Sequence, residues 1–306
     1  MQVSIIIVNY NTKELIKNCI NSIYENTKDI DFEIIVSDNG STDGSVEMLK
    51  NDFPNVILIE NNANLGFGKA NNNGLKVAKG EYIFYLNSDT VLLNNAVKMF
   101  YDYWEQNLQK DKIGALGANL LDSNFNINSS YADFPDINKS ILDGIRANYG
   151  LWKLFFLSFL GRDVNQKKKI CHYEKKVGEV GFICGADLFL KNDKNAFFDE
   201  NIFLYNEETD LQFQLMKLGK KRLLIDGPII IHLEGQSSKT NKFLFMEEIT
   251  KFSSINKNVS RIYYYKKNIS VVKAFVVKLL TLFMWLNPLV VKYNYKYIPA
   301  LLKNKM

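Results

Sequence analysis

The sequence predicts an α/β fold: an open, mostly parallel sheet with helices on both faces, followed by a helical C-terminal extension. Three observations predict it. Within the first 120 residues, apolar runs alternate with segments of helical periodicity, the pattern of strand–helix units in a parallel sheet. Each apolar run ends in polar residues, and parallel sheets bind ligands at that end of their strands. After Glu248 no acidic residue occurs, whereas eleven Lys and Arg follow.

Five apolar runs are expected to form strands. Residues 3–8 are rich in β-branched side chains, which is typical of a strand buried on both faces. Residues 32–36, 56–59 and 82–86 follow as the second, third and fourth strands, and residues 113–117 as a further one. Their spacing leaves room for a helix between successive strands, as a parallel sheet requires.

Helices are expected between these strands. Asn11 and Thr12 can cap the first helix, in which apolar residues from Leu15 to Ile23 recur at helical spacing. Gly80 is expected to stop the third helix. The remaining expected helices are, in chain order, 45–51, 69–79 and 94–108.

Composition and cysteine usage exclude several classes of protein. With 47% apolar and 23% charged residues over 306 positions, global disorder is excluded. Cys19, Cys171 and Cys184 lack CxxC spacing, which argues against a disulfide framework or zinc ribbon and fits a reducing compartment. The N-terminus lacks the basic region of a secretory signal, and the apolar stretch 279–291 is shorter than the ~20 residues that span a bilayer. We therefore expect a cytoplasmic protein.

Polar residues follow each of the first four strands. The four segments are 9–11, 37–45, 61–68 and 87–90. Asn, Gly, Ser and Asp are also ordinary turn residues, and for a single strand that explanation is sufficient. Four such segments at one sheet edge favour a ligand crevice. Neither GxGxxG after the first strand nor a GxxxxGK[ST] loop is present, which excludes nicotinamide-dependent hydride transfer and P-loop phosphoryl transfer.

Seven segments in order resemble the family-2 glycosyltransferases, most closely the rhamnosyltransferase-like branch of bacterial surface-polysaccharide synthesis. The resemblance covers residues 3–235, about three quarters of the chain. It implies a GT-A fold over residues 1–240, with a Rossmann-like nucleotide-sugar half (1–120), an acceptor half (121–240) and a basic tail (241–306). The segments are VSIIIVNYN, EIIVSDNGSTDGS, NANLGFGKANN, YIFYLNSDT, FICGADLFL, FFDENIFLYNEETDL and IIIHLEG.

The resemblance implies an inverting transfer of rhamnose or another hexose from a nucleoside-diphosphate donor. The implied acceptor is a growing, lipid-linked polysaccharide such as an O-antigen or a capsule. A nucleotidyltransferase is disfavoured because its basic, glycine-rich N-terminal signature is missing. The alternative from another class is a catalytically silent glycan-binding or assembly subunit, because Asn87 stands where similar enzymes have an acid.

The resemblance also implies a divalent cation, Mg²⁺ or Mn²⁺, on the donor diphosphate. Asp89 in NSDT matches the last acid of the Asp-x-Asp or Asn-Pro-Asp motif of similar enzymes, and His232 matches a histidine that often completes their metal site. A hard cation neutralises the charge of a departing diphosphate. The alternatives are a capping role for Asp89 and a structural role for His232.

The resemblance assigns the catalytic base to the acidic cluster Glu207, Glu208 and Asp210, which opens a helical segment. Glu208 matches the second acid of the family's Glu-Asp pair and is the preferred base, although it is one methylene longer than Asp. The alternative is that these acids only stabilise the positive end of the helix dipole.

Eight residues at the strand tips are expected to bind the donor. Asp38 follows the second strand, where such sheets contact the nucleoside, and Tyr10 can stack on the base. Gly66 and Gly68 let the backbone approach a ligand. The full set of expected donor-binding residues is Asn9, Tyr10, Asp38, Gly66, Gly68, Asn71, Asn87 and Ser88.

Lysines, aromatic residues and aliphatic residues alternate in the tail, as in interfacial helices. Residues 151–160 are also apolar and are expected to join the same face. We therefore expect peripheral association with the inner face of the cell membrane. Nucleic acid is not an expected partner, because the tail is too apolar for a solvated phosphate-binding strip. The tail can instead pack on the body, and the sequence leaves an oligomer open.

Overall fold

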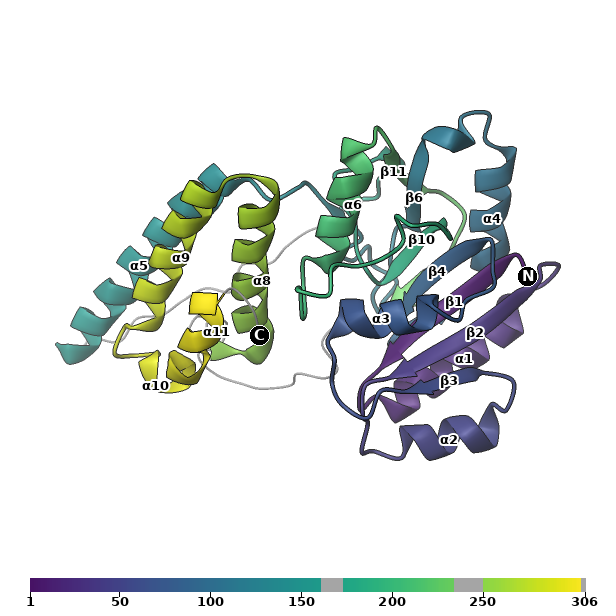
Figure 1. Cartoon of the computed structure of the whole chain (residues 1–306), viewed down its shortest axis with the longest axis horizontal. Coiled ribbons are helices and arrows are strands. Elements are labelled where there is room, and N and C mark those ends of the chain that lie inside the picture. Colours follow the sequence, from purple (N-terminus) through teal and green to yellow (C-terminus); the bar gives the residue numbers. More distant parts are fainter. Residues whose placement is uncertain (161–172, 234–249, 304–306) are drawn as a thin grey trace. The chain divides into compact units, whose positions relative to one another are not determined.

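The computed structural model describes residues 1–160, 173–233 and 250–303 (Figure 1). Cys171 and His172 therefore lie outside the described residues. The described chain forms two compact units. The first comprises residues 1–134, 173–200 and 208–233, and the second comprises residues 135–160, 201–207 and 250–303.

An eight-stranded sheet forms the centre of the first unit. The first four strands in sheet order are mutually parallel, and β6 and β11 are parallel to each other, whereas β10 and β8 run antiparallel to their neighbours. The expected mostly parallel sheet is confirmed. In sheet order the strands are β3 (Ile57–Glu60), β2 (Phe32–Asp38), β1 (Val3–Asn9), β4 (Tyr82–Asn87), β10 (Asp187–Lys191), β6 (Ile113–Ala118), β11 (Lys221–Ile225) and β8 (Gly178–Glu179).

Helices cover both faces of this sheet. Ile5 and Ile7 of β1 belong to one apolar cluster, together with residues of α1, α2 and α4. Ile6, between them, belongs to a second cluster with residues of α3 and α6. Alternate residues of β1 therefore point to opposite, equally buried faces, which explains its unbroken apolar run. The helices are α1 (Lys13–Asn26), α2 (Ser45–Asp52), α3 (Phe67–Leu75), α4 (Ala96–Gln106), the single 3₁₀ turn η1 (Lys110–Lys112) and α6 (Glu207–Lys217).

Gly80 does not stop a helix, contrary to the expectation from sequence. The helix expected over 69–79 is α3, which ends at Leu75. A Cβ atom on Gly80 would lie 2.3 Å from the backbone nitrogen of Ser4 and 2.6 Å from the carbonyl carbon of Val3. Glycine is therefore required here because the chain entering β4 touches the start of β1.

Two small antiparallel sheets complete the first unit. β5 (Thr90–Leu92) pairs with β12 (Ile230–His232), and β7 (Tyr131–Ala132) pairs with β9 (Phe182–Ile183). Each pair joins segments that lie far apart in sequence. Pairings of this kind leave no local sequence signal, so the sequence analysis did not anticipate them.

The second unit is helical. In it α5 and α8 both pack on α9, and Trp152 of α5 stacks on Phe283 of α9 with ring centroids 5.3 Å apart. Within the described ranges, no helix has both the length and the apolar character needed to cross a bilayer. The elements are α5 (Ile137–Phe159), α8 (Phe252–Asn268), α9 (Val271–Trp285), α10 (Val291–Asn294), the 3₁₀ turn η2 (Tyr295–Tyr297) and α11 (Ile298–Lys303).

Candidate active site

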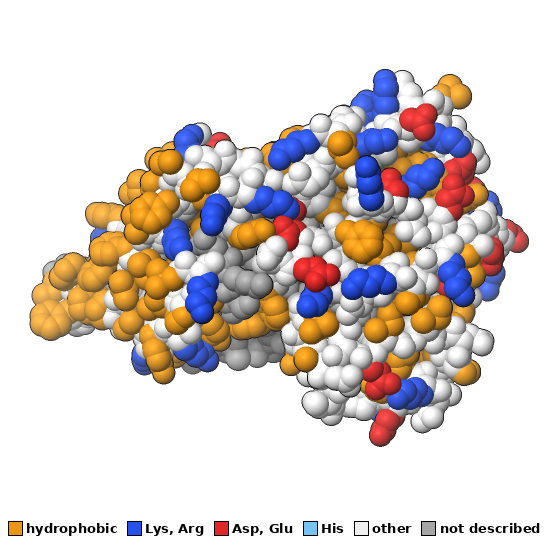
Figure 2. All heavy atoms as spheres, viewed as in Figure 1, with side chains coloured by type: hydrophobic (Ala, Val, Ile, Leu, Met, Phe, Trp, Pro, Cys, Tyr) orange, Lys and Arg blue, Asp and Glu red, His pale blue; other side chains and the backbone are white. Residues whose placement is uncertain are grey.

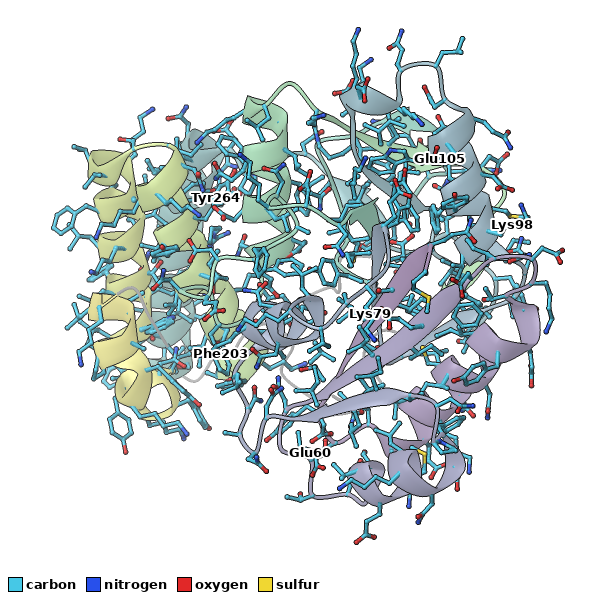
Figure 3. The ribbon with its side chains drawn as sticks, turned by 45° about the vertical axis from the view of Figure 1, so that its right-hand side comes forward. Glu60, Lys79, Lys98, Glu105, Phe203 and Tyr264 are labelled. Carbon is cyan, nitrogen blue, oxygen red and sulfur yellow. The ribbon has the colours of Figure 1, made fainter. Side chains whose placement is uncertain are left out.

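The carboxyl ends of β1, β2, β3 and β4 meet at one edge of the large sheet. The register pairs Asn9 with Asp38, Asp38 with Glu60, and Val8 with Asn87. Glu60 is labelled at its place in β3 in Figure 3. The four polar segments that follow these strands therefore start from the same edge, as the sequence predicts.

A hydrogen-bond network joins the loops after β1, β2 and β4. The amide nitrogen of Asn9 donates to Asp38 Oδ2 at 2.8 Å and to Ser41 Oγ at 3.0 Å. Its amide oxygen accepts from the Thr12 hydroxyl at 2.7 Å, and that hydroxyl lies 3.0 Å from Ser88 Oγ. Asn9 is fully buried, so it fixes the three loops relative to one another.

The carboxylate of Asp38 stabilises the loop that follows β2. Its side chain is 1% exposed, and Oδ1 accepts hydrogen bonds from the backbone N–H groups of Gly40 (3.0 Å) and Ser41 (2.8 Å). Together with the bond from Asn9, both carboxylate oxygens are engaged. Tyr10, by contrast, is 47% exposed at the same edge. The geometry gives Asp38 a loop-shaping role and leaves the ring of Tyr10 open to solvent.

The predicted glycines and Asn71 shape the start of α3. Gly66 immediately precedes the helix with a φ of 85°, a conformation that favours glycine. Its carbonyl accepts a hydrogen bond from Asn39 Nδ2 at 3.1 Å. Gly68 and Asn71 are buried, and Asn71 Nδ2 donates to the carbonyl of Phe67 at 3.1 Å. Asn71 therefore stabilises the first turn of α3.

Asp89 and His232 are brought together by the pairing of β5 with β12. This pairing sets His232 opposite Thr90, and the backbone N–H of Leu233 donates to the carbonyl of Asp89 at 2.9 Å. His232 Nε2 lies 3.3 Å from Asp89 Oδ1 and 3.4 Å from Asn87 Nδ2. Two expected metal ligands, distant in sequence, are thus neighbours at the tip of β4.

The Asp89–His232 pair fits a divalent cation. His232 is 4% exposed and its Nδ1 atom has no hydrogen-bond partner. Two donor atoms 3.3 Å apart can both lie ~2.1 Å from one cation as adjacent ligands. Over the described parts of the chain, no group of three or more His, Cys, Asp or Glu side chains forms a metal site. A cation here would take its other ligands from substrate or water, as Mg²⁺ commonly does.

Glu208 borders the segment that contacts the tip of β4. A Cβ atom on Gly185 would lie 3.4 Å from Glu208 Cβ and 3.6 Å from its Cγ. The next residue, Ala186, accepts a hydrogen bond through its carbonyl from the Asn87 backbone N–H at 3.1 Å. Glu208 and Asp210 belong to the first unit, with Asp89 and His232, whereas Glu207 is grouped with the second.

Gln212 positions the start of α6, a role that the sequence analysis missed. Its side-chain oxygen accepts from the Ile183 N–H and its nitrogen donates to the Ile183 carbonyl, both at 2.8 Å. The same nitrogen lies 3.2 Å from the Glu208 carbonyl, which also accepts from it. Gln212 is fully buried and one helical turn after Glu208. This spacing from Glu208 was the signal available in the sequence, but the fold alone shows that the partner of Gln212 is the backbone of Ile183 in β9.

Asp187 is a buried acid close to the end of β4 that sequence reasoning did not single out, and it pairs with Leu86. It opens β10 and is fully buried. Its Oδ2 accepts from the Ala118 N–H at 2.6 Å, and Oδ1 has no hydrogen-bond partner. Burial raises the pKa of this carboxyl well above its ordinary value. An acid held in this way is expected to be protonated over a wide pH range.

A sequence model of the family described as "Glycosyl transferase family 2" matches residues 4–159. Glycosyltransferase GlyG of Streptococcus pneumoniae is 28% identical over 225 residues, covering 68% of this chain and 71% of that protein. The poly(ribitol-phosphate) β-glucosyltransferase of Bacillus spizizenii is 36% identical over 121 residues, but the match spans only 19% of its length and 38% of this chain. WfaP of Escherichia coli is 37% identical over 121 residues, covering 36% of this chain and 47% of that protein.

Solved structures share the fold. The mannosyltransferase PcManGT of Pyrobaculum calidifontis, in complex with GDP-Man and Mn²⁺, aligns with a TM-score of 0.55 and 14% identity, covering 98% of this chain and 75% of that one. TarS 1–349 of S. aureus, in complex with UDP, aligns with a TM-score of 0.52 and 15% identity, covering 99% and 79%. These neighbours have the GT-A fold. Because the family model matches half of the chain and the fold is that of the GT-A neighbours, the protein belongs to glycosyltransferase family 2 and is a glycosyltransferase.

Proposed function

We propose that this glycosyltransferase moves a sugar, with inversion, from a nucleoside-diphosphate donor to a growing, lipid-linked surface glycan. The observation that carries the proposal is the 3.3 Å approach of His232 to Asp89 at the edge where four strands end. The acceptor class is supported by WfaP, named as acting on GlcNAc-diphosphoundecaprenol, and by the poly(ribitol-phosphate) transferase. Rhamnose or another hexose remains our proposal for the transferred sugar.

Donor binding is assigned to the loops after β1 to β4. Tyr10 is exposed enough to stack on the nucleobase, and Gly66 keeps the backbone at the start of α3 clear of side chains. Asn9 and Asp38 act by holding these loops in place, because their polar atoms are already hydrogen-bonded to one another. Ser88 immediately precedes Asp89, and its hydroxyl lies 3.0 Å from that of Thr12, so we assign it to the part of the donor site next to Asp89. Gly68, Asn71 and Asn87 complete the donor-binding set proposed from the sequence.

Asp89 and His232 would hold Mg²⁺ or Mn²⁺ on the donor diphosphate. When bound, the cation neutralises the negative charge that gathers on a departing diphosphate. Asn87 contributes no charge, so Asp89 supplies the single carboxylate of this pair. His232 is held in place through its backbone, because its N–H donates to the Leu121 carbonyl at 2.8 Å.

Glu208 is assigned as the general base. It takes the proton of the acceptor hydroxyl, the acceptor oxygen bonds to the anomeric carbon, and the bond from that carbon to the diphosphate oxygen breaks. Glu207 and Asp210 are 3% and 2% exposed, whereas Glu208 is only partly buried, which favours Glu208 as the group that meets an acceptor. A hydrolase would instead use two carboxylates on either side of the scissile bond.

A donor screen tests the proposal. Thermal unfolding of the full chain is measured with a panel of nucleotide sugars, with and without Mn²⁺, and hydrolysis of each donor is followed in parallel. We expect one donor class to raise the melting temperature only with the cation, and the same donor to be hydrolysed slowly. A catalytically silent glycan-binding subunit would show neither effect, and that result would overturn the proposal.

A further inference from the structure

The second unit contains a cavity of about 160 Å³ between α5, α8 and α9. Part of its wall is apolar, formed by residues such as Leu280 and Met284 of α9. The remainder is polar and includes Arg261 of α8 and Asn148 of α5. Because every lining residue belongs to the second unit, the cavity exists within that unit alone.

Arg261 is a charged residue in the lining of this cavity. Its Nη2 donates to Asn258 Oδ1 at 2.9 Å, which orients the guanidinium, while its Nε is buried without a hydrogen-bond partner. Across the described residues, no carboxylate lies within 4.0 Å of this guanidinium. A partly buried cation without a counter-ion is costly, so the arrangement favours an anionic ligand.

Asn148 also belongs to the lining of this cavity. The residue is 6% exposed, and its Nδ2 donates to the carbonyls of Gly144 and Leu280, both at 2.9 Å. Its Oδ1 is buried and has no hydrogen-bond partner. The side chain of Asn148 is therefore used to join α5 to α9, and the guanidinium of Arg261 is the group in this cavity that suits a phosphate.

The charge around the cavity favours an anion. The described residues of the second unit carry thirteen Lys and Arg against three Asp and Glu. Asp143, the acid that lines the cavity, has a side chain that is 56% exposed and lies 3.6 Å from Arg146. On α9, the pKa of Lys278 is lowered by burial and by the neighbouring positive charge of Lys266. The surroundings are therefore positive on more than one helix.

The outer surface of α9 is apolar. Residues along this helix expose between 37% and 74% of their surface. Figure 2 shows hydrophobic side chains gathered over the region of α5 and α9, with Lys and Arg between them. The exposed apolar residues of α9 are Val271, Val272, Phe275, Val276, Leu279 and Phe283.

We propose that this cavity binds the phosphate headgroup of an anionic lipid, with the guanidinium of Arg261 on the phosphate. The positive, apolar surface beside the cavity favours a lipid as the source of the phosphate over a free ion. The inference rests on the membrane association expected from the sequence for the tail and residues 151–160, and it adds a specific headgroup site to it.

The test compares Arg261→Gln with Lys257→Gln in the full-length protein. Lys257 is exposed on the same helix and one turn earlier, so both variants lose one positive charge. Binding is measured to phosphatidylcholine vesicles with and without phosphatidylglycerol. Loss of a surface lysine should weaken binding by about fivefold. Loss of Arg261 should weaken it by more than about tenfold, because hydrogen bonds to a desolvated phosphate are lost as well. Arg261→Lys should recover only part of this loss.

Three results separate the outcomes. If the wild-type protein does not bind the anionic vesicles, the membrane association itself fails. If it binds and Arg261→Gln equals Lys257→Gln, the headgroup site is wrong while membrane association stands. If inorganic phosphate or glycerol phosphate raises the melting temperature through Arg261 but the vesicles do not distinguish the two variants, the cavity takes a free phosphate and the lipid assignment is overturned. Donor hydrolysis should be equal in all variants.

Discussion

Glu208 differs from its acidic neighbours because its side chain is only partly buried, whereas Glu207 and Asp210 are almost entirely covered. A Cβ atom added at Gly185 would make ordinary van der Waals contact with Glu208 Cβ at 3.4 Å and Cγ at 3.6 Å, so Gly185 lies directly beside the candidate base. Gln212 then fixes the first turn of α6 by its paired bonds to Ile183. At the residue scale, the candidate base is a carboxylate held on a helix that is itself fastened to β9.

Replacing Glu208 by Gln should lower turnover by about 10²- to 10⁴-fold, because the amide cannot accept the acceptor's proton. The Michaelis constant for the donor should change little, since the amide has nearly the same shape. Steady-state kinetics measures both quantities. Glu47→Gln, at an exposed position of α2, is the matched control and should behave as wild type. Near-normal turnover of the Glu208 variant would remove it from the base role.

Replacing Asp89 by Asn should weaken Mn²⁺ binding by at least about tenfold, because the amide removes the charged ligand beside His232. Direct titration of Mn²⁺ by electron paramagnetic resonance, in the presence of donor, measures the affinity. Chelation should abolish sugar transfer by the wild-type protein, and added Mn²⁺ should restore it. Equal Mn²⁺ affinity in the two proteins would contradict the assignment of Asp89.

Two elements depend on contacts that their own sequences do not reveal. Thr12 is the N-cap residue of α1, as expected, but its hydroxyl bonds to Asn9 instead of capping the helix. The exposed N–H of Lys13 is satisfied by Asp43 at 2.9 Å, from the segment that precedes α2. β10 enters the sheet between β4 and β6 and is antiparallel to both. Its buried first residue, Asp187, lies next to Ala118.

Gly80→Ala should destabilise the first unit by about 1–3 kcal/mol or more, because the new methyl group would meet backbone atoms of Val3 and Ser4. Urea unfolding measures the change in free energy. Gly150→Ala in α5 is the matched control: no atom lies within 4 Å of its added Cβ, so it should stabilise its helix by up to about 1 kcal/mol. Equal stability of the Gly80 variant and the wild type would contradict the close approach.

Asp187→Asn should change the pH dependence of stability. In the unfolded chain this carboxyl ionises near pH ~3.9, but burial keeps its folded pKa well above that value. The wild-type protein therefore loses stability through this group as pH rises above ~4, until the folded pKa is reached. The amide does not titrate, so the variant should gain stability relative to wild type between pH 4 and pH 7. Urea unfolding at several pH values measures the difference, and a constant difference would refute the buried neutral acid.

The molecule combines a sheet-based unit and a helical unit whose described residues carry net charges of opposite sign, negative in the first and positive in the second. The helical unit takes α5 from the middle of the chain as well as the helices after residue 250. Residues 151–160, which were expected to join the same face as the tail, belong largely to α5, and α5 packs on α9. Its exposed apolar residues and excess of lysine support peripheral association with an anionic membrane, which we propose takes place at the inner face of the cell membrane.

Substituting Phe275 and Leu279 together by Ser should weaken flotation with anionic vesicles by at least about tenfold, because each loses apolar area that enters the acyl boundary. These residues are 57% and 48% exposed, so folding should be unaffected. Leu108→Ser with Phe125→Ser, exposed positions of the first unit, is the control and should float as wild type. If both double variants lost flotation equally, the assignment of α9 as the membrane-binding helix would be wrong.

The sequence by itself determined the parallel strands, the shared edge of their polar ends and the family. Each depends on local patterns: runs of apolar residues, turn residues after them, and motifs in order. Asp89, His232 and the acidic cluster were also proposed as site residues from motifs of this kind. Tertiary structure alone decided four other features. They are the pairing of β5 with β12, the hydrogen bond from the Lys13 N–H to Asp43, the two hydrogen bonds between Gln212 and Ile183, and the cavity lined by Arg261. They join residues whose separation in the chain carries no periodic signal, because only the folded backbone determines which atoms meet.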